Sequence, residues 1–123
     1  MRNSIILFLF PLFVSSQEVL IKSLPENINT NNAEINFIQI NDTTAFFTTI
    51  NAENLKLESK IYSVFLKNGN WQKSKYSAYN FDLFNTSNIS PSDDGRVFLT
   101  ICNSEMSGCR LVYMEKDKKE IFY

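Results

Sequence analysis

The chain has 123 residues, with 12 Lys or Arg against 13 Asp or Glu, and it contains no histidine. The near-neutral charge argues against a nucleic-acid-binding protein, which normally carries a basic excess. The lack of histidine excludes Ser-His and Cys-His catalysis and histidine-ligated metals. We therefore predict an ordinary globular domain that is not an enzyme, with no catalytic, cofactor-binding or metal-ligating residues and no cofactor.

The N-terminal segment has the features of a secretory signal peptide. Arg2 gives a positive start, residues 5–14 form an apolar run of about ten residues, and small residues lead up to Ser16. We expect residues 1–16 to be removed after export, which leaves residues 17–123 in the periplasm or secreted; the alternative is a buried N-terminal strand or helix. No other run is long enough for a transmembrane helix, so we predict no membrane span.

The two cysteines, Cys102 and Cys109, are an even number in a chain that we expect to be exported. That combination favours a disulfide. Cys102 ends one predicted strand and Cys109 begins the next, so the bond would cross a hairpin. Two free buried thiols are the alternative, and a zinc site is less favoured because two thiolates leave its ligand shell incomplete.

Short apolar runs rich in Ile, Val, Phe, Tyr and Thr alternate with polar clusters, and helical periodicity is almost absent. This pattern is typical of an all-β protein with many short strands. We expect residues 19–23 to be a ninth strand besides eight others. In chain order the eight predicted strands are residues 35–40, 44–50, 60–66, 70–74, 86–90, 96–102, 110–115 and 119–123.

The predicted strands recur as two copies of a four-strand unit. Residues 45–49 align with residues 97–101 at a spacing of 52, and residues 61–64 align with residues 111–114 at a spacing of 50. Such a period is typical of β-propeller blades. The strands are apolar on both faces, as a blade packed between neighbours requires.

The expected architecture is therefore two four-stranded antiparallel blades, a partial β-propeller. The first blade covers about residues 24–76 and the second about residues 82–123. The alternative is a small β-sandwich whose strands are apolar on both faces.

Several short motifs resemble the TolB-like β-propeller repeat of bacterial exported proteins, of the kind that precedes OmpA-like domains in Bacteroidetes. In the first copy the similarity lies at residues 28–34, at residues 61–62 and at the Asn-Gly-Asn-Trp of residues 68–71. In the second copy it lies at residues 90–91, at the Asp-Gly-Arg-Val-Phe of residues 94–98, at residues 102–109 and at Tyr113. The resemblance implies a tight turn at Gly95, which suits glycine because it can adopt a positive φ at no steric cost.

The first copy departs from the family pattern at Asn41-Asp42-Thr43, where Ser-Pro-Asp-Gly is expected. The chain also contains only about two blades. The resemblance implies a non-enzymatic interaction module of the cell envelope that binds a protein or another envelope component. The alternatives are a truncated remnant of a longer propeller with no independent function and, less favoured, part of a carbohydrate- or peptide-active enzyme.

Two blades alone would leave two outer blade faces uncovered. We expect Phe47, Tyr62, Leu99 and Val112 to lie on these faces and to promote self-association or docking onto separate blades. Phe98 is expected to be buried inside the second blade.

Four acidic residues, Asp42, Asp82, Asp93 and Asp94, fall in predicted loops. Acid–base catalysis needs two carboxyl groups that converge in one cleft, and nothing in their spacing requires this. The sequence at Asp93-Asp94 is interpreted as a turn rather than a calcium loop.

An aromatic run formed by Tyr76, Tyr79, Phe81 and Phe84 lies in the link between the two copies. It is either an exposed stacking surface for sugars or peptides, or a packed connection between the blades. We favour the packed connection.

Overall fold

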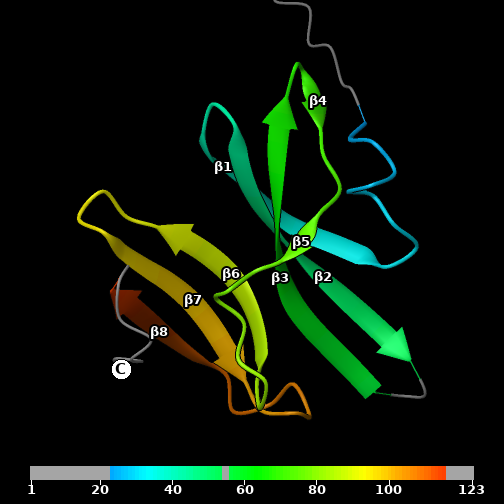
Figure 1. Ribbon diagram of the computed structural model, residues 1–123. Helices are drawn as coiled ribbons and strands as arrows, with labels where there is room; N and C mark the ends of the chain where they lie inside the picture. The colour runs from blue at the N-terminus through cyan, green and yellow to red at the C-terminus, as the bar shows by residue number, and fades with distance from the viewer. Residues whose placement is uncertain (1–22, 54–55, 116–123) are drawn as a thin grey trace, which may run out of the picture.

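The computed structural model describes residues 23–53 and 56–115, and in this part of the chain it contains eight β-strands and no helix (Figure 1). The predicted all-β class is confirmed. The strands are β1 (Ala33–Asn41), β2 (Thr44–Glu53), β3 (Lys56–Lys67), β4 (Asn70–Trp71), β5 (Lys75–Tyr76), β6 (Asn85–Pro91), β7 (Arg96–Cys102) and β8 (Arg110–Glu115).

The six longer strands, β1–β3 and β6–β8, correspond to six of the predicted ones. The strand predicted at residues 70–74 is shorter, because only Asn70 and Trp71 pair with β3. The strand predicted at residues 119–123 lies outside the described residues, as does most of the candidate at residues 19–23, of which Ser23 is not in a strand.

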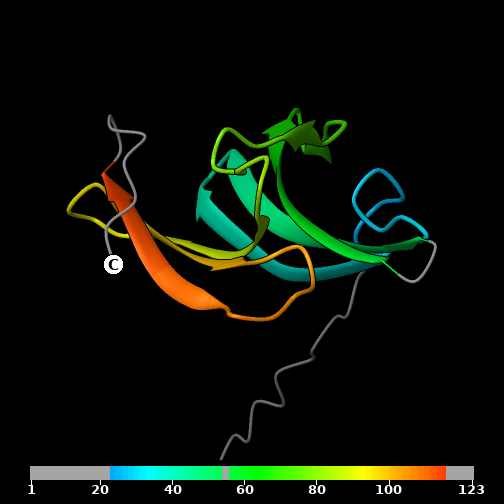
Figure 2. The same cartoon turned by 90° about the horizontal axis from the view of Figure 1, so that it is seen from below.

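The strands form two antiparallel sheets, each with its main strands in chain order. The first sheet has the order β1-β2-β3-β4, with β5 also paired to β3, and the second has the order β6-β7-β8. In both views the segment that joins β5 to β6 runs along the junction of the two sheets (Figures 1 and 2). The first strand of the second sheet, β6, contacts β1, β2 and β3 of the first.

The internal repeat found in the sequence is present in the strand pairing. Thr48 of β2 pairs with Ile61 of β3, and Thr100 of β7 pairs with Leu111 of β8. The β2–β3 pairing and the β7–β8 pairing therefore have the same register once the spacings of 52 and 50 residues are applied. Within residues 23–53 and 56–115 the two sheets share one three-strand unit, and the first sheet also has the short strands β4 and β5. The residues equivalent to β4, at 120–121, lie outside the described part of the chain.

A β-bulge marks the same place in both copies. The pairing of β1 with β2 is interrupted between Ile35 and Ile38, and that of β6 with β7 between Ser87 and Ser90. A bulge bends its strand and increases the local twist. Both sheets therefore change direction at the same position along their first strand.

The main hydrophobic core fills the junction between the sheets. The first sheet contributes Phe46 and Ile61 to it. Most of its buried members come from the second sheet and are Ile89, Val97, Leu99, Ile101, Val112 and Met114.

A second cluster lies on the opposite face of the first sheet and contains Ile28, Ala45, Phe47 and Val64. Successive residues of a strand point to opposite faces, so β2 supplies Phe46 to one core and Phe47 to the other. This arrangement accounts for the apolar character of both faces of β2.

The prediction that Phe47, Leu99 and Val112 lie on uncovered faces is wrong, since they are 2%, 0% and 2% exposed. The segment around Ile28 covers Phe47, and the side of the second sheet that bears Leu99 and Val112 is turned toward the first sheet. Tyr62, named with them, is half-buried and stacks on Phe47 with ring centroids 5.9 Å apart.

The prediction that Phe98 is buried inside the second blade is also wrong. Phe98 is only half-buried, because it lies on the face of β7 opposite to that of the buried Leu99. Among residues 23–53 and 56–115, the core between the sheets covers the Leu99 face of the second sheet and not the face that carries Phe98.

Candidate interaction surface

The acidic residues singled out in the sequence lie in three separate turns or loops. Asp42 is in the turn between β1 and β2, Asp82 is in the segment before β6, and Asp93 and Asp94 are in the turn between β6 and β7. Among residues 23–53 and 56–115, no group of three or more acidic, Cys or His side chains could hold a metal ion. The same residues include no helix long and apolar enough to cross a membrane.

Asp94 is part of the turn that joins β6 to β7. Its Oδ2 accepts a hydrogen bond from Nε of Arg96 at 2.7 Å, and its Oδ1 accepts one from the Arg96 backbone N–H at 3.2 Å. These bonds lower the pKa of Asp94 to about 2. Gly95 has φ of +84°, as predicted for this turn, and its N–H donates to the carbonyl oxygen of Ser92 at 3.1 Å.

The turn also fixes the guanidinium of Arg96 over two rings. Its central carbon lies 5.6 Å from the ring centroid of Phe98 and 5.7 Å from that of Tyr113. Contacts of this kind between a cation and an aromatic face contribute about 0.5–1 kcal/mol at exposed sites. Arg96 therefore holds the two rings together at one end of the second sheet.

Phe98, Thr100, Leu111 and Tyr113 share one face of the second sheet, because Phe98 pairs with Tyr113 and Thr100 with Leu111. We call these four residues the outer face. Leu111 is 68% exposed, and the other three are half-buried. Apolar side chains thus occupy a side of the sheet that the core does not use.

The repeat shows what this face would look like if it were covered. Thr100 and Leu111 are equivalent to Thr48 and Ile61 of the first sheet, both of which are 0% exposed. Phe98 is equivalent to Phe46, which is 8% exposed. Equivalent positions are therefore buried in the first sheet and accessible in the second.

The covering layer on the first sheet comes from the next repeat. The ring of Tyr79 packs edge-on against Phe46 at 5.8 Å, and Ile89 of β6 belongs to the same cluster. The backbone N–H of Asn88 donates to Oγ1 of Thr48 at 3.3 Å. This face of the unit thus receives the first strand of the following unit and the segment before it.

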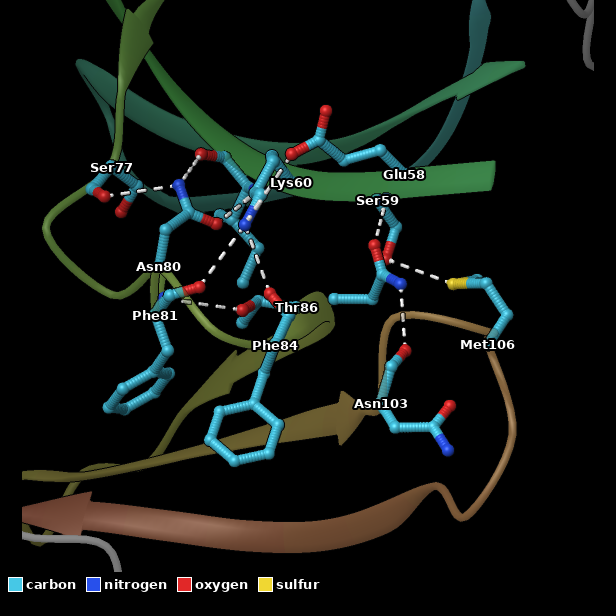
Figure 3. Close-up of polar contacts among 12 residues, drawn as sticks. Glu58, Ser59, Lys60, Ser77, Asn80, Phe81, Phe84, Thr86, Asn103 and Met106 are labelled. Atoms are coloured by element: carbon cyan, nitrogen blue, oxygen red, sulfur yellow. Dashed lines mark hydrogen bonds and ion pairs between the residues drawn. The ribbon is translucent and has the colours of Figure 1, made fainter. Parts of the chain in front are cut away.

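Two asparagine side chains fasten the covering layer to β3 (Figure 3). Asn80 accepts a hydrogen bond from the Ile61 N–H at 2.8 Å and donates one to the Ile61 carbonyl at 2.7 Å. Asn85 accepts from the Ser59 N–H at 2.8 Å and donates to the Asn103 carbonyl at 2.9 Å. Asn80 therefore pairs with both backbone groups of Ile61 as a neighbouring strand would, and Asn85 joins β3 to the loop between β7 and β8.

Lys60 adds a charged contact at the same junction (Figure 3). Its ammonium donates to the carbonyl oxygens of Phe81 at 3.1 Å and Phe84 at 3.0 Å, and lies 3.7 Å from Glu58. Its side chain is 12% exposed. Lys60 thus holds the connecting segment in place.

The aromatic run before β6 is divided between packing and exposure. Tyr79 and Phe81 pack against the main core, as the favoured interpretation predicts. Tyr76 is 52% exposed, and Leu83, within the same segment, is 84% exposed. Only the middle of the run is a packed connection.

Cys102 and Cys109 form a disulfide with a sulfur–sulfur distance of 2.07 Å, across the loop between β7 and β8. Inside this loop the side-chain oxygen of Asn103 accepts from the backbone N–H groups of Glu105 at 3.1 Å and Ser107 at 2.9 Å. The predicted pairing is therefore present in the structure, at one end of the second sheet.

Thr100 and Leu111 belong to no motif that marks them as functional residues in the sequence. The alignment of residues 61–64 with residues 111–114 could have identified them, because it places Leu111 on the face of its sheet that is equivalent to the face carrying Ile61. The faces could not be assigned to core or solvent until the position of β6 was known.

Comparison of the chain with protein-family models, with curated proteins and with solved structures found no match. The fold and the outer face together define an all-β protein made of two antiparallel repeat units, with one repeat surface accessible.

Proposed function

We propose that this protein is an exported, non-enzymatic interaction module of the cell envelope, and that the outer face is its binding surface. One observation carries the proposal: Leu111 is 68% exposed, whereas the equivalent Ile61 is fully buried beneath the next repeat. Exposed apolar patches of this kind mark interaction sites in soluble proteins.

The compartment is supported by two features of the chain. Residues 1–16 have the pattern of a signal peptide, and the Cys102–Cys109 disulfide is compatible with an oxidising compartment. The resemblance to TolB-like repeats supports a location in the envelope and a protein or another envelope component as the partner.

A binding role also agrees with the polar side chains of the fold, because those described above form hydrogen bonds that stabilise the structure. Asn80, Asn85 and Lys60 hold the two sheets and the connecting segment together. Asp94 fixes a turn and Arg96. These groups have structural partners, which favours an interaction module over the enzyme alternative.

The proposal is tested by site-specific photo-crosslinking in cells that export the protein. A crosslinking amino acid replaces Leu111 in one variant and Leu83 in the matched control, since Leu83 is even more exposed, at 84%, but lies off the outer face. We expect a discrete adduct from position 111 and not from position 83. No adduct at position 111, or equal labelling from both positions, would contradict the proposal and favour a remnant without function.

A further inference from the structure

We propose that the Cys102–Cys109 disulfide is a site of reversible thiol–disulfide exchange with a dithiol protein, and that its reduction releases the loop of residues 103–108 from the first sheet. This inference goes beyond the proposed function and does not depend on the outer face. Three features support it: one sulfur belongs to an exposed residue, a hollow adjoins the disulfide, and a strained residue in the loop contacts β3.

The two cysteines of the chain differ in their exposure to solvent. Cys102, the last residue of β7, is 4% exposed, whereas Cys109, the residue before β8, is exposed. Exposed disulfides are more readily exchanged than buried ones, because the attacking thiolate must approach one of the sulfurs directly. The Cys109 sulfur is therefore the one that a second protein can attack.

A hollow of about 350 Å³ adjoins the disulfide. It is lined by Phe84, Ile101, Cys102, Asn103, Gly108 and Arg110. Phe84, which is 37% exposed, and Ile101 give it an apolar wall, and Arg110 contributes a cation. A cation close to a cysteine favours its thiolate form, which is the form in which Cys102 leaves during exchange. The hollow can therefore accept the apolar residues beside the attacking cysteine of the partner.

The loop that the disulfide closes contacts Ser59 of β3 (Figure 3). The Ser59 hydroxyl donates to the Met106 sulfur at 3.8 Å. The Ser59 N–H donates to the side chain of Asn85 at 2.8 Å, and that side chain donates to the Asn103 carbonyl at 2.9 Å. Since Ser59 is 1% exposed, the loop reaches a buried point of the junction between the sheets through both contacts.

Met106 has a strained backbone conformation within this loop. Its φ is +57°, a value that residues other than glycine, asparagine and aspartate rarely adopt. The Met106 N–H donates to the Asn103 carbonyl and the Asn103 N–H donates to the Ser107 carbonyl, both at 3.1 Å. Such strain persists only where the surrounding structure enforces it. Opening the disulfide removes one of these constraints, so the loop can relax and withdraw the Met106 sulfur from Ser59.

Reduction proceeds through a mixed disulfide at Cys109. A thiolate of the partner attacks the Cys109 sulfur, the sulfur–sulfur bond breaks, and Cys102 leaves as a thiolate that takes up a proton. The partner's second thiol, once deprotonated, attacks the partner's own sulfur in the mixed disulfide and releases Cys109, which is protonated in turn. The chain has then gained two electrons and two protons, and the partner has been oxidised to a disulfide. The same steps in reverse close the loop again.

The exchange is tested on protein expressed from the full sequence and exported, with dithiothreitol as the dithiol. Thiols are trapped with iodoacetamide and counted by mass spectrometry, and the chain has two cysteines, so every alkylation reports on this disulfide. We expect reduction of the folded protein to be slower than reduction in urea by no more than about tenfold. A larger difference would show a disulfide that the fold protects and would overturn the inference.

Hydrogen exchange of backbone amides tests the release of the loop. Reduction should raise the exchange rate of the Ser59 amide at least about tenfold, because Asn85 loses the fixed carbonyl of Asn103. The amide of Val64, which is buried in the same strand and paired with Ala45 of β2, is the matched control and should not change. Unchanged exchange at Ser59, equal acceleration at both amides, or loss of the folded state on reduction would contradict the proposal.

The double variant Cys102→Ser/Cys109→Ser separates the effect of the disulfide from that of the reductant. Its Ser59 amide should exchange as fast as that of the reduced wild type, with or without dithiothreitol. If this variant does not fold, the reduced wild-type protein carries the comparison. A folded variant with the slow Ser59 exchange of the oxidised wild type would overturn the proposal, because the loop would then stay on β3 without the bond.

Discussion

The side chains of Asn36 and Asn88, 52 residues apart, are hydrogen bonded to each other across the two sheets, with Asn36 Nδ2 donating to Asn88 Oδ1. Both residues have positive φ, 54° and 56°, and both lie within the bulge of the first strand of their sheet. The two repeat units therefore touch at equivalent positions. Asparagine is one of the few residues with a side chain that adopts this backbone conformation at low cost.

Asn88 provides the first prediction. Asn88→Val should lower the free energy of unfolding by about 1–3 kcal/mol, because a β-branched residue is strained at positive φ. Asn88→Gly loses the same side-chain bonds, including the one to Thr100 Oγ1 at 3.3 Å, but keeps the backbone unstrained. Urea denaturation should therefore rank valine well below glycine, and equal stabilities would show that the bulge conformation is unimportant.

Asn85 should contribute strongly to the free energy of unfolding, since it is 5% exposed and joins the two sheets. Asn85→Ala leaves the buried Ser59 N–H without its partner, which costs about 1–3 kcal/mol, whereas the carbonyl of the exposed Asn103 can bind water instead. Denaturation should show a loss of at least about 1 kcal/mol. The control is Asn70→Ala at an exposed position, which should change stability by a few tenths of a kcal/mol; a comparable loss in both variants would refute the role of Asn85.

The strands and their register were accessible from the sequence for specific reasons. The run at residues 44–50 is long, β-branched and aromatic, and its recurrence at residues 97–101 identifies the second unit. The turn at Gly95 was readable because Asp-Gly has a strong local preference. The bulges were not accessible, since an Asn-Phe and an Asn-Ile pair carry no comparable local signal.

The facing of the strands could not be derived from periodicity. Alternation places Phe46 and Phe47 on opposite sides of β2, but it does not say which side meets the second sheet. The answer depends on Ile28, which lies in a polar, non-periodic segment that predicts only a turn. Ile28 covers Phe47, and packing against the first sheet buries Leu99 and Val112; both contacts are long-range, so alternation along a strand does not predict them.

Asp94 should give the turn between β6 and β7 a measurable pH dependence. Its pKa is lowered from 3.8 to about 2 by the hydrogen bonds from Arg96, so its ionised form is favoured in the folded state. The contribution of ionised Asp94 to the free energy of unfolding is present above a pH of about 4 and is lost as the pH falls toward 2. The difference in unfolding free energy between wild type and Asp94→Asn should narrow over that range.

Asp93→Asn is the matched control for this pH series. Asp93 is exposed in the same turn and forms no ion pair with the described residues. Its replacement removes one carboxylate from the turn but keeps the hydrogen bonds between Asp94 and Arg96, so it is the reference for the change in net charge. If Asp94→Asn shows the same profile as Asp93→Asn at every pH, the Asp94–Arg96 pair does not contribute to folding.

The Cys102–Cys109 disulfide closes a short loop, with a sequence separation of 7. A loop of this length reduces the entropy of the unfolded chain enough to stabilise the fold by about 2–3 kcal/mol in the chain-entropy model. Reduction should lower the free energy of unfolding by that amount. Mass spectrometry of unreduced, denatured protein treated with iodoacetamide should find no alkylated cysteine, and two alkylated thiols in exported material would refute the pairing.

Neighbouring residues of β7 provide the sharpest test of its facing. Leu99 is 0% exposed in the core between the sheets, whereas Phe98 is half-buried on the outer face. Leu99→Ala should cost about 2–5 kcal/mol, since it removes buried methyl groups and leaves a cavity. Phe98→Ala should cost less in the monomer, although it removes a larger side chain, because its ring is already partly in water and its site can fill with solvent. Denaturation at low protein concentration measures both, and a greater loss for Phe98 than for Leu99 would reverse the facing of β7 and place the accessible surface on the other side of the sheet.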